Sequence, residues 1–163
     1  MYHTFMDSPL GRLTLFSDGQ AITAITMPVW RYIPPSGSQE NPELSVFRLA
    51  NRCLGNYFTG ADMIDIPPFY PAGTPFQQQV WTLLTEIPRG TAVTYGDIAR
   101  KLEKINGSPT SPRAVGGAVG RNPIAILIPC HRVLGAGGRI TGFGGGLDAK
   151  RFLLELEGIP YQE

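Results

Sequence analysis

The stretch that decides the fold class of the chain is SPRAVGGAVG, residues 111–120. A serine followed by a proline is typical of the first turn of a helix, and the apolar residues after it continue a helical pattern. Another short helix is predicted upstream over residues 95–102, and the polar residues 106–109 connect the two. Two short helices joined in this way predict a helix-turn-helix. The inward-facing side chains of the upstream helix are Ile98, Ala99 and Leu102.

The second helix of this pair is rich in small residues. Gly116, Gly117 and Gly120 each cost about 1 kcal/mol relative to alanine in a helix interior, so something should compensate for them. A helix that presses its backbone into the narrow minor groove of DNA needs small residues, whereas a helix that reads the major groove needs long polar ones. Arg113 and Arg121 bracket the segment with charges that can reach phosphates or a base stack. The minor groove is therefore favoured, but close packing against another helix explains the glycines equally well.

A proline-rich segment over residues 67–73 predicts a boundary between two domains, because its prolines cannot sustain a helix or a central strand. Thr74 then caps a new helix, and Pro75 suits its first turn. The apolar stripe of this helix consists of Phe76, Val80, Trp81 and Leu84. We expect an N-terminal domain over residues 1–72 and a C-terminal domain over residues 73–163.

The N-terminal domain begins with the pattern of a short β-meander. Strands are predicted over residues 2–6, 13–16 and 22–27. A loop rich in proline, serine and glycine follows over residues 33–38 and is expected to be mobile. The helix after it has an apolar face made of Phe47, Ala50, Leu54, Tyr57 and Phe58. Cys53 lies beside that face, and we expect a packed core thiol because apolar surroundings do not stabilise a thiolate.

The composition is that of a globular protein, with 42% hydrophobic and 17% charged residues among 163, which suffices for a buried core. No apolar run approaches the roughly 18 residues that span a bilayer, and the first residues lack the pattern of a signal peptide. We therefore expect a cytoplasmic protein without membrane contact. Two cysteines are too few for a disulfide framework or a cysteine-based zinc site.

The charges are distributed unevenly along the chain, although the net charge is only +1. Residues 1–74 carry four basic and six acidic side chains, whereas residues 75–163 carry ten basic and seven acidic ones. The second half is the better candidate for a face that binds DNA. A difference of this size also arises by chance.

An apolar, mostly β-branched run over residues 124–128 predicts a buried strand that ends at Pro129. Cys130 and His131 then lie where a strand gives way to a loop, a common position for reactive side chains. Adjacent side chains rarely face each other, so His131 would reach the Cys130 thiol through a bridging water. A thiol with a pKa of about 8.5 is only a few per cent ionised at neutral pH, so a base must assist it. A buried cysteine beside a structural histidine explains these two residues equally well.

Glu157 is the candidate that would hold this histidine. It lies in the last turn of an apolar helix that Gly158 ends, where a carboxylate opposes the helix dipole and needs another explanation. Pairing with an imidazole would supply that explanation. Taken alone, a solvated surface glutamate is the simpler interpretation.

Residues 141–146, Thr-Gly-Phe-Gly-Gly-Gly, form a glycine-rich loop before a helix. The loop lacks the Gly-Lys-Ser/Thr ending of a phosphate-binding loop. A loop that offers bare backbone amides to a flat base, with Phe143 against its face, fits better. A flexible hinge is the alternative.

Together these residues resemble the O6-alkylguanine-DNA alkyltransferase family, closely over residues 73–158 and loosely before them. The most specific segment is Ile128-Pro129-Cys130-His131-Arg132-Val133, with Asn122 eight residues before the cysteine and Glu157 27 residues after it. The other segments are Gly73-Thr74-Pro75-Phe76-Gln77, Tyr95-Gly96, Arg113-Ala114-Val115-Gly116-Gly117-Ala118, Asn122-Pro123 and Glu157-Gly158.

The resemblance implies an α+β fold. A small ribonuclease-H-like domain of sheet and helix would precede a mainly helical domain with a winged-helix-like helix-turn-helix. It also implies DNA repair by direct reversal, in which a suicide enzyme moves the alkyl group of O6-alkylguanine irreversibly to Cys130. No cofactor and no metal is implied, and activity on O4-alkylthymine is left open.

The same resemblance implies residue roles. Cys130 would accept the alkyl group, Glu157, His131 and a water would form the relay that makes its thiolate, and Asn122 would brace the cysteine turn. Arg113 would replace the flipped nucleotide in the base stack. Tyr95 would assist rotation of the phosphate of that nucleotide and donate toward the guanine ring.

Substrate binding and DNA binding are implied for further positions. Backbone groups at Cys130, Val133 and Gly144 would read the base edge, with Phe143 beside them. The residues implied in DNA contact are Thr94, Ala114, Gly117, Ala118 and Arg121. The partner would be double-stranded DNA with an alkylated guanine, bound through its minor groove by a monomer. Cooperative assembly on DNA is left open.

Three departures from the family pattern stand out. Phe143 and Gly144 replace a tyrosine and a serine of some relatives, which removes two hydroxyl groups. The connection over residues 102–111 is longer than in many relatives and ends in Ser111-Pro112. The N-terminal part lacks the cysteine cluster of the relatives that bind zinc.

Two other classes of function fit parts of the pattern. A Cys-His hydrolase or acyltransferase would use the same thiol over many turnovers. A module that binds damaged bases without repairing them would need no cysteine.

Overall fold

The computed structural model describes residues 1–30 and 36–163, so residues 33–35 of the predicted mobile loop lie outside the described residues. The chain forms two compact units. The first unit consists of Met1–Ala72 together with Pro123–Leu127, and the second unit consists of Gly73–Asn122 and Ile128–Glu163. Pro123–Leu127, which we had assigned to the C-terminal domain, thus groups with the first unit.

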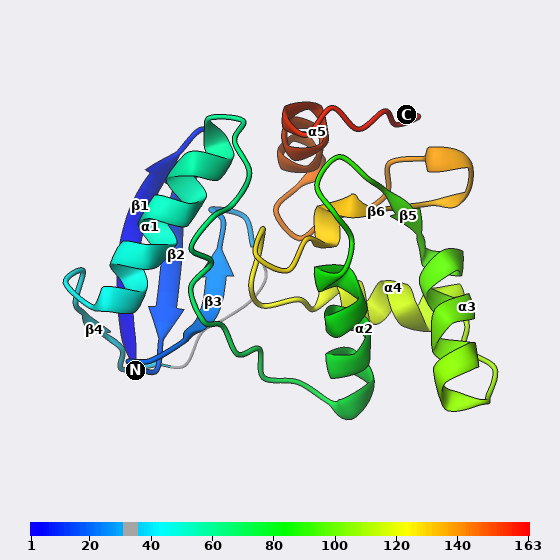
Figure 1. Cartoon of the computed structure of the whole chain (residues 1–163), viewed down its shortest axis with the longest axis horizontal. Helices are drawn as coiled ribbons and strands as arrows, with labels where there is room; N and C mark the ends of the chain where they lie inside the picture. The colour runs from blue at the N-terminus through cyan, green and yellow to red at the C-terminus, as the bar shows by residue number, and fades with distance from the viewer. Residues whose placement is uncertain (31–35) are drawn as a thin grey trace. The chain divides into compact units, whose positions relative to one another are not determined.

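The first unit is built on a sheet with strand order β3-β2-β1-β4. Its strands are β1 (Tyr2–Ser8), β2 (Gly11–Ser17), β3 (Ile22–Thr26) and β4 (Gln39–Glu40). The first three strands form an antiparallel meander, as predicted, and β4 pairs in parallel with β1 (Figure 1). Strand β4 was not predicted because two residues carry no periodicity.

Helix α1 (Ser45–Phe58) lies against one face of this sheet (Figure 1). The helix buries Val46, Phe47, Ala50, Cys53, Leu54 and Tyr57. Burial raises the pKa of the Cys53 thiol to about 11, and the negative charge of Asp65 adds to this effect. The prediction that Cys53 is a core thiol is confirmed.

The apolar run over residues 124–128 is buried, as predicted, but it is not a strand. Its contact with β3 is a single bridge, in which the Ile25 N–H donates to the Pro123 carbonyl (3.0 Å) and the Ala125 N–H donates to the Ile25 carbonyl (3.2 Å). Ile126 has a φ of 72°, which breaks extended geometry and is rare for a β-branched residue. Prolines on both sides also lack the N–H groups that a ladder needs.

The second unit contains four helices among the described residues, and they are α2 (Pro75–Thr85), α3 (Tyr95–Asn106), α4 (Pro112–Gly120) and α5 (Leu147–Leu156). Strands β5 (Val93–Thr94) and β6 (Val133–Leu134) pair in parallel, and Cys130–Arg132 and Ala136–Gly138 form the short 3-10 turns η1 and η2. Helices α2, α3 and α4 pack on one another (Figure 1). The predicted α+β class with its helix-turn-helix is confirmed.

The helix ends follow from local chemistry. Thr74 and Thr94 each form a reciprocal capping box, with Gln77 and Asp97 respectively, and Ser111 accepts from the Ala114 N–H. These side chains satisfy backbone donors that a helix start leaves unpaired. Helix α3 runs to Asn106, beyond the predicted end, and stops where Gly107 adopts a φ of 69°.

Gly73, at the start of the second unit, has a steric reason to be glycine. A Cβ atom there would lie 2.4 Å from the ring of Trp81. Trp81 is buried, and its indole N–H donates to the Ala118 carbonyl (2.9 Å). Glycine thus allows the chain to enter α2 directly over this ring.

Two further findings concern the described residues as a whole. No helix in residues 1–30 or 36–163 is long and apolar enough to cross a membrane. The same ranges hold no group of three or more His, Cys, Asp or Glu residues that could bind a metal ion.

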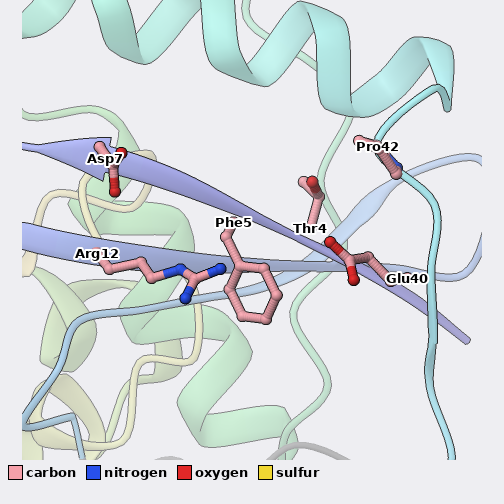
Figure 2. Close-up of a pocket in the computed structure, with 6 residues that line it drawn as sticks. All are labelled: Thr4, Phe5, Asp7, Arg12, Glu40 and Pro42. Carbon is pink, nitrogen blue, oxygen red and sulfur yellow. The ribbon is translucent and has the colours of Figure 1, made fainter.

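A polar hollow of about 470 Å³ opens on the first unit. Figure 2 shows the residues that line it, Thr4, Phe5, Asp7, Arg12, Glu40 and Pro42. The Arg12 guanidinium lies over the Phe5 ring, 3.8 Å from its centroid. None of the residues predicted to take part in chemistry lines this hollow.

Candidate active site

Cys130 begins the turn η1 and is only 3% exposed. The Cys130 N–H donates to the Ile128 carbonyl (2.8 Å), and the Asn122 side-chain amide donates to the same oxygen (2.8 Å). One carbonyl thus receives two hydrogen bonds at the point where the chain turns. Asn122 thereby ties the end of α4 to the turn that carries the sulfur.

The thiol of Cys130 is not acidic in the folded chain. Burial raises its pKa to about 11, although the Asn122 side chain, the positive charge of Lys150 and backbone N–H groups act in the opposite direction. The loss of hydration on burial outweighs these polar contacts. The sulfur therefore needs a base when it reacts.

His131, the next residue in the chain, is held in one orientation by Glu157. It is fully buried, and its Nε2 lies 2.5 Å from Oε2 of Glu157. Burial lowers the pKa of His131 and Glu157 opposes this effect, so the ring is neutral at pH 7. Because an ionised carboxylate can only accept, Nε2 carries the hydrogen and the basic lone pair lies on Nδ1.

Glu157 accepts hydrogen bonds from three other donors besides His131. The guanidinium of Arg132 donates to both carboxylate oxygens (2.8 and 3.2 Å), and the Gly90 N–H donates to Oε1 (3.1 Å). Arg132 also donates to the Ile87 carbonyl (2.7 Å). The Glu157 side chain is 0% exposed, so the alternative of a solvated surface glutamate is wrong. These partners explain a carboxylate at the end of a helix.

Arg132 had no predicted role, although it lies within the most specific segment. Its guanidinium forms a buried ion pair with the carboxylate of Glu157. A buried carboxylate beside a neutral histidine requires such a partner. The signal was present, because an arginine follows the cysteine and the histidine directly.

Lys150, on α5, is a second residue that the sequence did not single out. It is fully buried, and its ammonium group donates to the carbonyls of Val133 (2.8 Å) and Thr141 (3.4 Å). Burial lowers its pKa to about 8. The available signal was its spacing. Lys150 lies three residues before Leu153 and four before Leu154, so it falls on the apolar face of α5.

Tyr95, at the start of α3, reaches the glycine-rich segment. Its hydroxyl lies 3.0 Å from the hydroxyl of Thr141 and is partly buried. Phe143 and Gly144 are also partly buried, and the Gly146 N–H donates to the Phe143 carbonyl (3.0 Å). The segment therefore holds a defined turn.

The outer face of α4 bears the small residues that the sequence emphasised. Gly117 and Gly120 are exposed, and a Cβ atom on either would meet no other atom within 4 Å. Close packing against another helix therefore does not explain these two glycines. Arg113, Ala114 and Arg121 are exposed as well.

Two residues implied in DNA contact form hydrogen bonds within the protein. Ala118 is only 4% exposed and its carbonyl accepts from the indole N–H of Trp81, so its contact with DNA stays a prediction with little exposed surface to support it. It lies one position beyond the exposed Gly117, and on a helix this turns the side chain toward the core. The Thr94 hydroxyl accepts from the Asp97 N–H as the cap of α3.

Comparison with known proteins gives one consistent result. Residues 75–159 match the family described as "6-O-methylguanine DNA methyltransferase, DNA binding domain", and residues 1–64 match "6-O-methylguanine DNA methyltransferase, ribonuclease-like domain". A methylated-DNA–protein-cysteine methyltransferase of Haemophilus influenzae is 47% identical over 99% of this chain and 88% of its own length. One of Methanosarcina acetivorans is 44% identical over 97% and 99%.

A solved structure is similar over nearly the whole chain. It is the crystal structure of Mycobacterium tuberculosis OGT in complex with DNA, with a TM-score of 0.87 and 41% identity over 96% of this chain and 92% of that one. The chain belongs to the 6-O-methylguanine DNA methyltransferase family. The predicted family, its ribonuclease-like first domain and the activity of a DNA-repair methyltransferase are confirmed.

Proposed function

We propose that Cys130 removes the alkyl group from O6-alkylguanine in double-stranded DNA and keeps it. The observation that carries this proposal is the joint placement of three groups. A buried thiol sits on a turn braced by Asn122, and the next residue is a neutral histidine locked to the carboxylate of Glu157. This is the constellation of a nucleophile, a base and a group that orients the base.

The thiolate would form only when the substrate is present. With a pKa of about 11, the resting thiol is protonated at neutral pH and is protected from unwanted reactions. His131 would take its proton through Nδ1 and a bridging water, while Glu157 stabilises the imidazolium that results. Arg132 and the Gly90 N–H donate to the Glu157 carboxylate and hold it in place.

The transfer is a displacement at the alkyl carbon. The thiolate of Cys130 forms the new sulfur–carbon bond as the bond between that carbon and O6 breaks, and the electron pair of the broken bond stays with guanine. Guanine regains a proton, which balances the one that left the thiol. The product thioether has no good leaving group, so each molecule would act once.

DNA would be bound through α4 in the minor groove. The exposed glycines and Ala114 allow the backbone of this helix to approach closely, and Arg121 would contact phosphate. Arg113 would fill the gap left by the flipped nucleotide. Tyr95 would donate toward the guanine ring, and backbone groups of Cys130, Val133 and Gly144 would hold its edge beside Phe143.

We further propose that a monomer performs this reaction in the cytoplasm, where a reduced thiol persists. Whether an O4-alkylthymine enters the same site is a question of substrate range. It does not alter the role of Cys130.

The test is the amount of methyl group transferred per protein molecule. Duplex DNA that carries O6-[³H-methyl]guanine in excess should label the protein to one equivalent and no further. A hydrolase or acyltransferase would release product over many turnovers. A module that only binds damage would transfer no label.

The two cysteines supply matched variants. Cys53→Ala should still be labelled, because Cys53 is a core thiol of the first unit. Cys130→Ala should bind the DNA and remain unlabelled. Labelling of Cys130→Ala would overturn the proposal.

A further inference from the structure

Thr141 joins two parts of the second unit that lie far apart in the sequence. Its side-chain hydroxyl lies 3.0 Å from the hydroxyl of Tyr95, which is 46 residues earlier. Tyr95 begins α3, whereas Thr141 begins the glycine-rich segment of residues 141–146. In that segment Thr141 is the residue with a side-chain hydroxyl, since one phenylalanine and four glycines follow it.

Thr141 is itself held in place from two other directions. Its carbonyl accepts from the ammonium group of the buried Lys150 (3.4 Å), which also holds the Val133 carbonyl (2.8 Å). Its methyl group lies close to Gly135, where an added Cβ atom would be 3.0 Å from it. A β-branched side chain fixed at its backbone and its methyl group offers its hydroxyl in one direction.

The direction of the hydrogen bond between Tyr95 and Thr141 decides where the Tyr95 proton can point. A phenol has one proton and can both donate and accept. If Thr141 donates to the phenolic oxygen, the Tyr95 proton must point elsewhere, toward an acceptor in the site. The hydrogen bond from Thr141 also lowers the pKa of Tyr95 against the larger, raising effect of burial. A donor that itself accepts a hydrogen bond is a stronger donor.

We propose that Thr141 is a positioning residue for alkyl transfer, because its hydroxyl donates to Tyr95 and aims the Tyr95 proton at the departing guanine. The inference rests on the proposed function, in which Tyr95 donates to the guanine ring. As the bond to O6 breaks, negative charge grows on guanine, and a strong, aimed donor stabilises that charge. Thr141 acts through Tyr95 and needs no contact with the base.

The experiment measures the single-turnover rate at saturating O6-methylguanine duplex and, separately, the Kd for the same duplex. Thr141→Val removes the hydroxyl and keeps the shape. We expect its transfer rate to fall about 3- to 10-fold, the effect of one hydrogen bond, with an unchanged Kd. Thr141→Ser should retain most of the rate because it retains the hydroxyl.

A double-mutant cycle with Tyr95→Phe separates positioning from a general structural effect. In the Tyr95→Phe background, Thr141→Val should cause no further loss of rate, since the hydroxyl has lost its target. If Thr141→Val does not fold, Thr141→Ala and Thr141→Ser form the same comparison without the methyl group. Thr82→Val, which removes an exposed threonine hydroxyl of α2, is the matched control.

Each outcome decides the matter. A Thr141→Val rate equal to the wild-type rate overturns the inference, and so does an equal fall with and without the Tyr95 hydroxyl. An unchanged transfer rate with a raised Kd overturns it as well, because it would place Thr141 in DNA binding. A wild-type chain that transfers no methyl group to Cys130 defeats the proposed function itself, which distinguishes that failure from the failure of Thr141 alone.

Discussion

Glu157 is central to the proposed proton relay, because its carboxylate contacts both His131 and Arg132. Glu157→Gln keeps the shape but removes the charge that stabilises an imidazolium. We expect the rate of methyl transfer to fall by a factor of about 100 or more. The unpaired Arg132 should also destabilise the fold by about 3–5 kcal/mol, so the rate must be measured well below the melting temperature.

The control for this variant is Glu155→Gln, two residues earlier on α5. Glu155 is exposed and accepts from the hydroxyl of Tyr161. Its transfer rate should equal that of the wild-type chain. If Glu157→Gln did the same, Glu157 would have no part in the relay.

Lys150 brings a positive charge close enough to lower the pKa of Cys130. The pKa of Lys150 is itself lowered to about 8, so the lysine is charged at neutral pH, where the transfer takes place. In Lys150→Met this charge is lost, so the thiolate of Cys130 should be harder to form and the single-turnover transfer rate at pH 7 should fall, tenfold for each loss of about 1.4 kcal/mol of interaction. Lys150→Arg keeps the charge and should retain more of the rate. A Lys150→Met rate at pH 7 that equals the wild-type rate would contradict this role.

His131 should make the folded chain sensitive to acid. Its pKa is lowered from 6.5 in the folded chain, so below about pH 6.5 the unfolded chain binds a proton that the folded chain resists. The stability contributed by neutral His131 is complete above this pH and is lost as the pH falls through the folded value. Melting temperatures from pH 8 to pH 5 should therefore decrease toward acid, and less so in His131→Gln. A wild-type melting temperature that rises toward pH 5 would refute the assignment.

At the scale of an element, the glycines of α4 lower the stability of the helix and leave its outer face open to close approach by DNA. Gly117→Ala should stabilise the free protein by about 0.5–1 kcal/mol, because alanine suits a helix interior and the added methyl meets no atom. The same methyl group should weaken binding to duplex DNA if α4 enters the minor groove. Thermal melting and a DNA titration at fixed salt measure the two effects. Gains in both stability and affinity would exclude a close approach of this face to DNA.

The elements that the sequence predicted well are those whose signals are local. The starts of three helices can be read from their capping residues, Thr74, Thr94 and Ser111. Each of these side chains accepts from the N–H group three residues later. The run over residues 124–128 was mistaken for a strand because its composition is that of a strand. Its backbone is instead set by Ile126 and by contacts with β3, about 100 residues earlier in the chain, which no local pattern reveals.

At the scale of the whole molecule, the candidate site also combines residues predicted from sequence with contacts that only the fold creates. Cys130, His131, Asn122 and Glu157 were predicted from a specific spacing, and the fold brings them together. The sequence did not single out Lys150 or the hydroxyl of Thr141. Their contacts depend on the fold, which brings Lys150 to the Val133 carbonyl and Thr141 to the Tyr95 hydroxyl. The burial that raises the pKa of Cys130 likewise depends on the complete fold. Sequence thus predicted the candidate reacting groups, and only the structure showed the contacts that surround them.

Peptide mass mapping of the whole protein tests the alkyl-acceptor role of Cys130 most directly. After incubation with duplex DNA that contains O6-methylguanine, the peptide with Cys130 should gain one methyl group in proportion to the guanine restored, and the peptide with Cys53 should gain none. Guanine restored without a methyl group on Cys130, or with the methyl group on another residue, would contradict the role assigned to this sulfur.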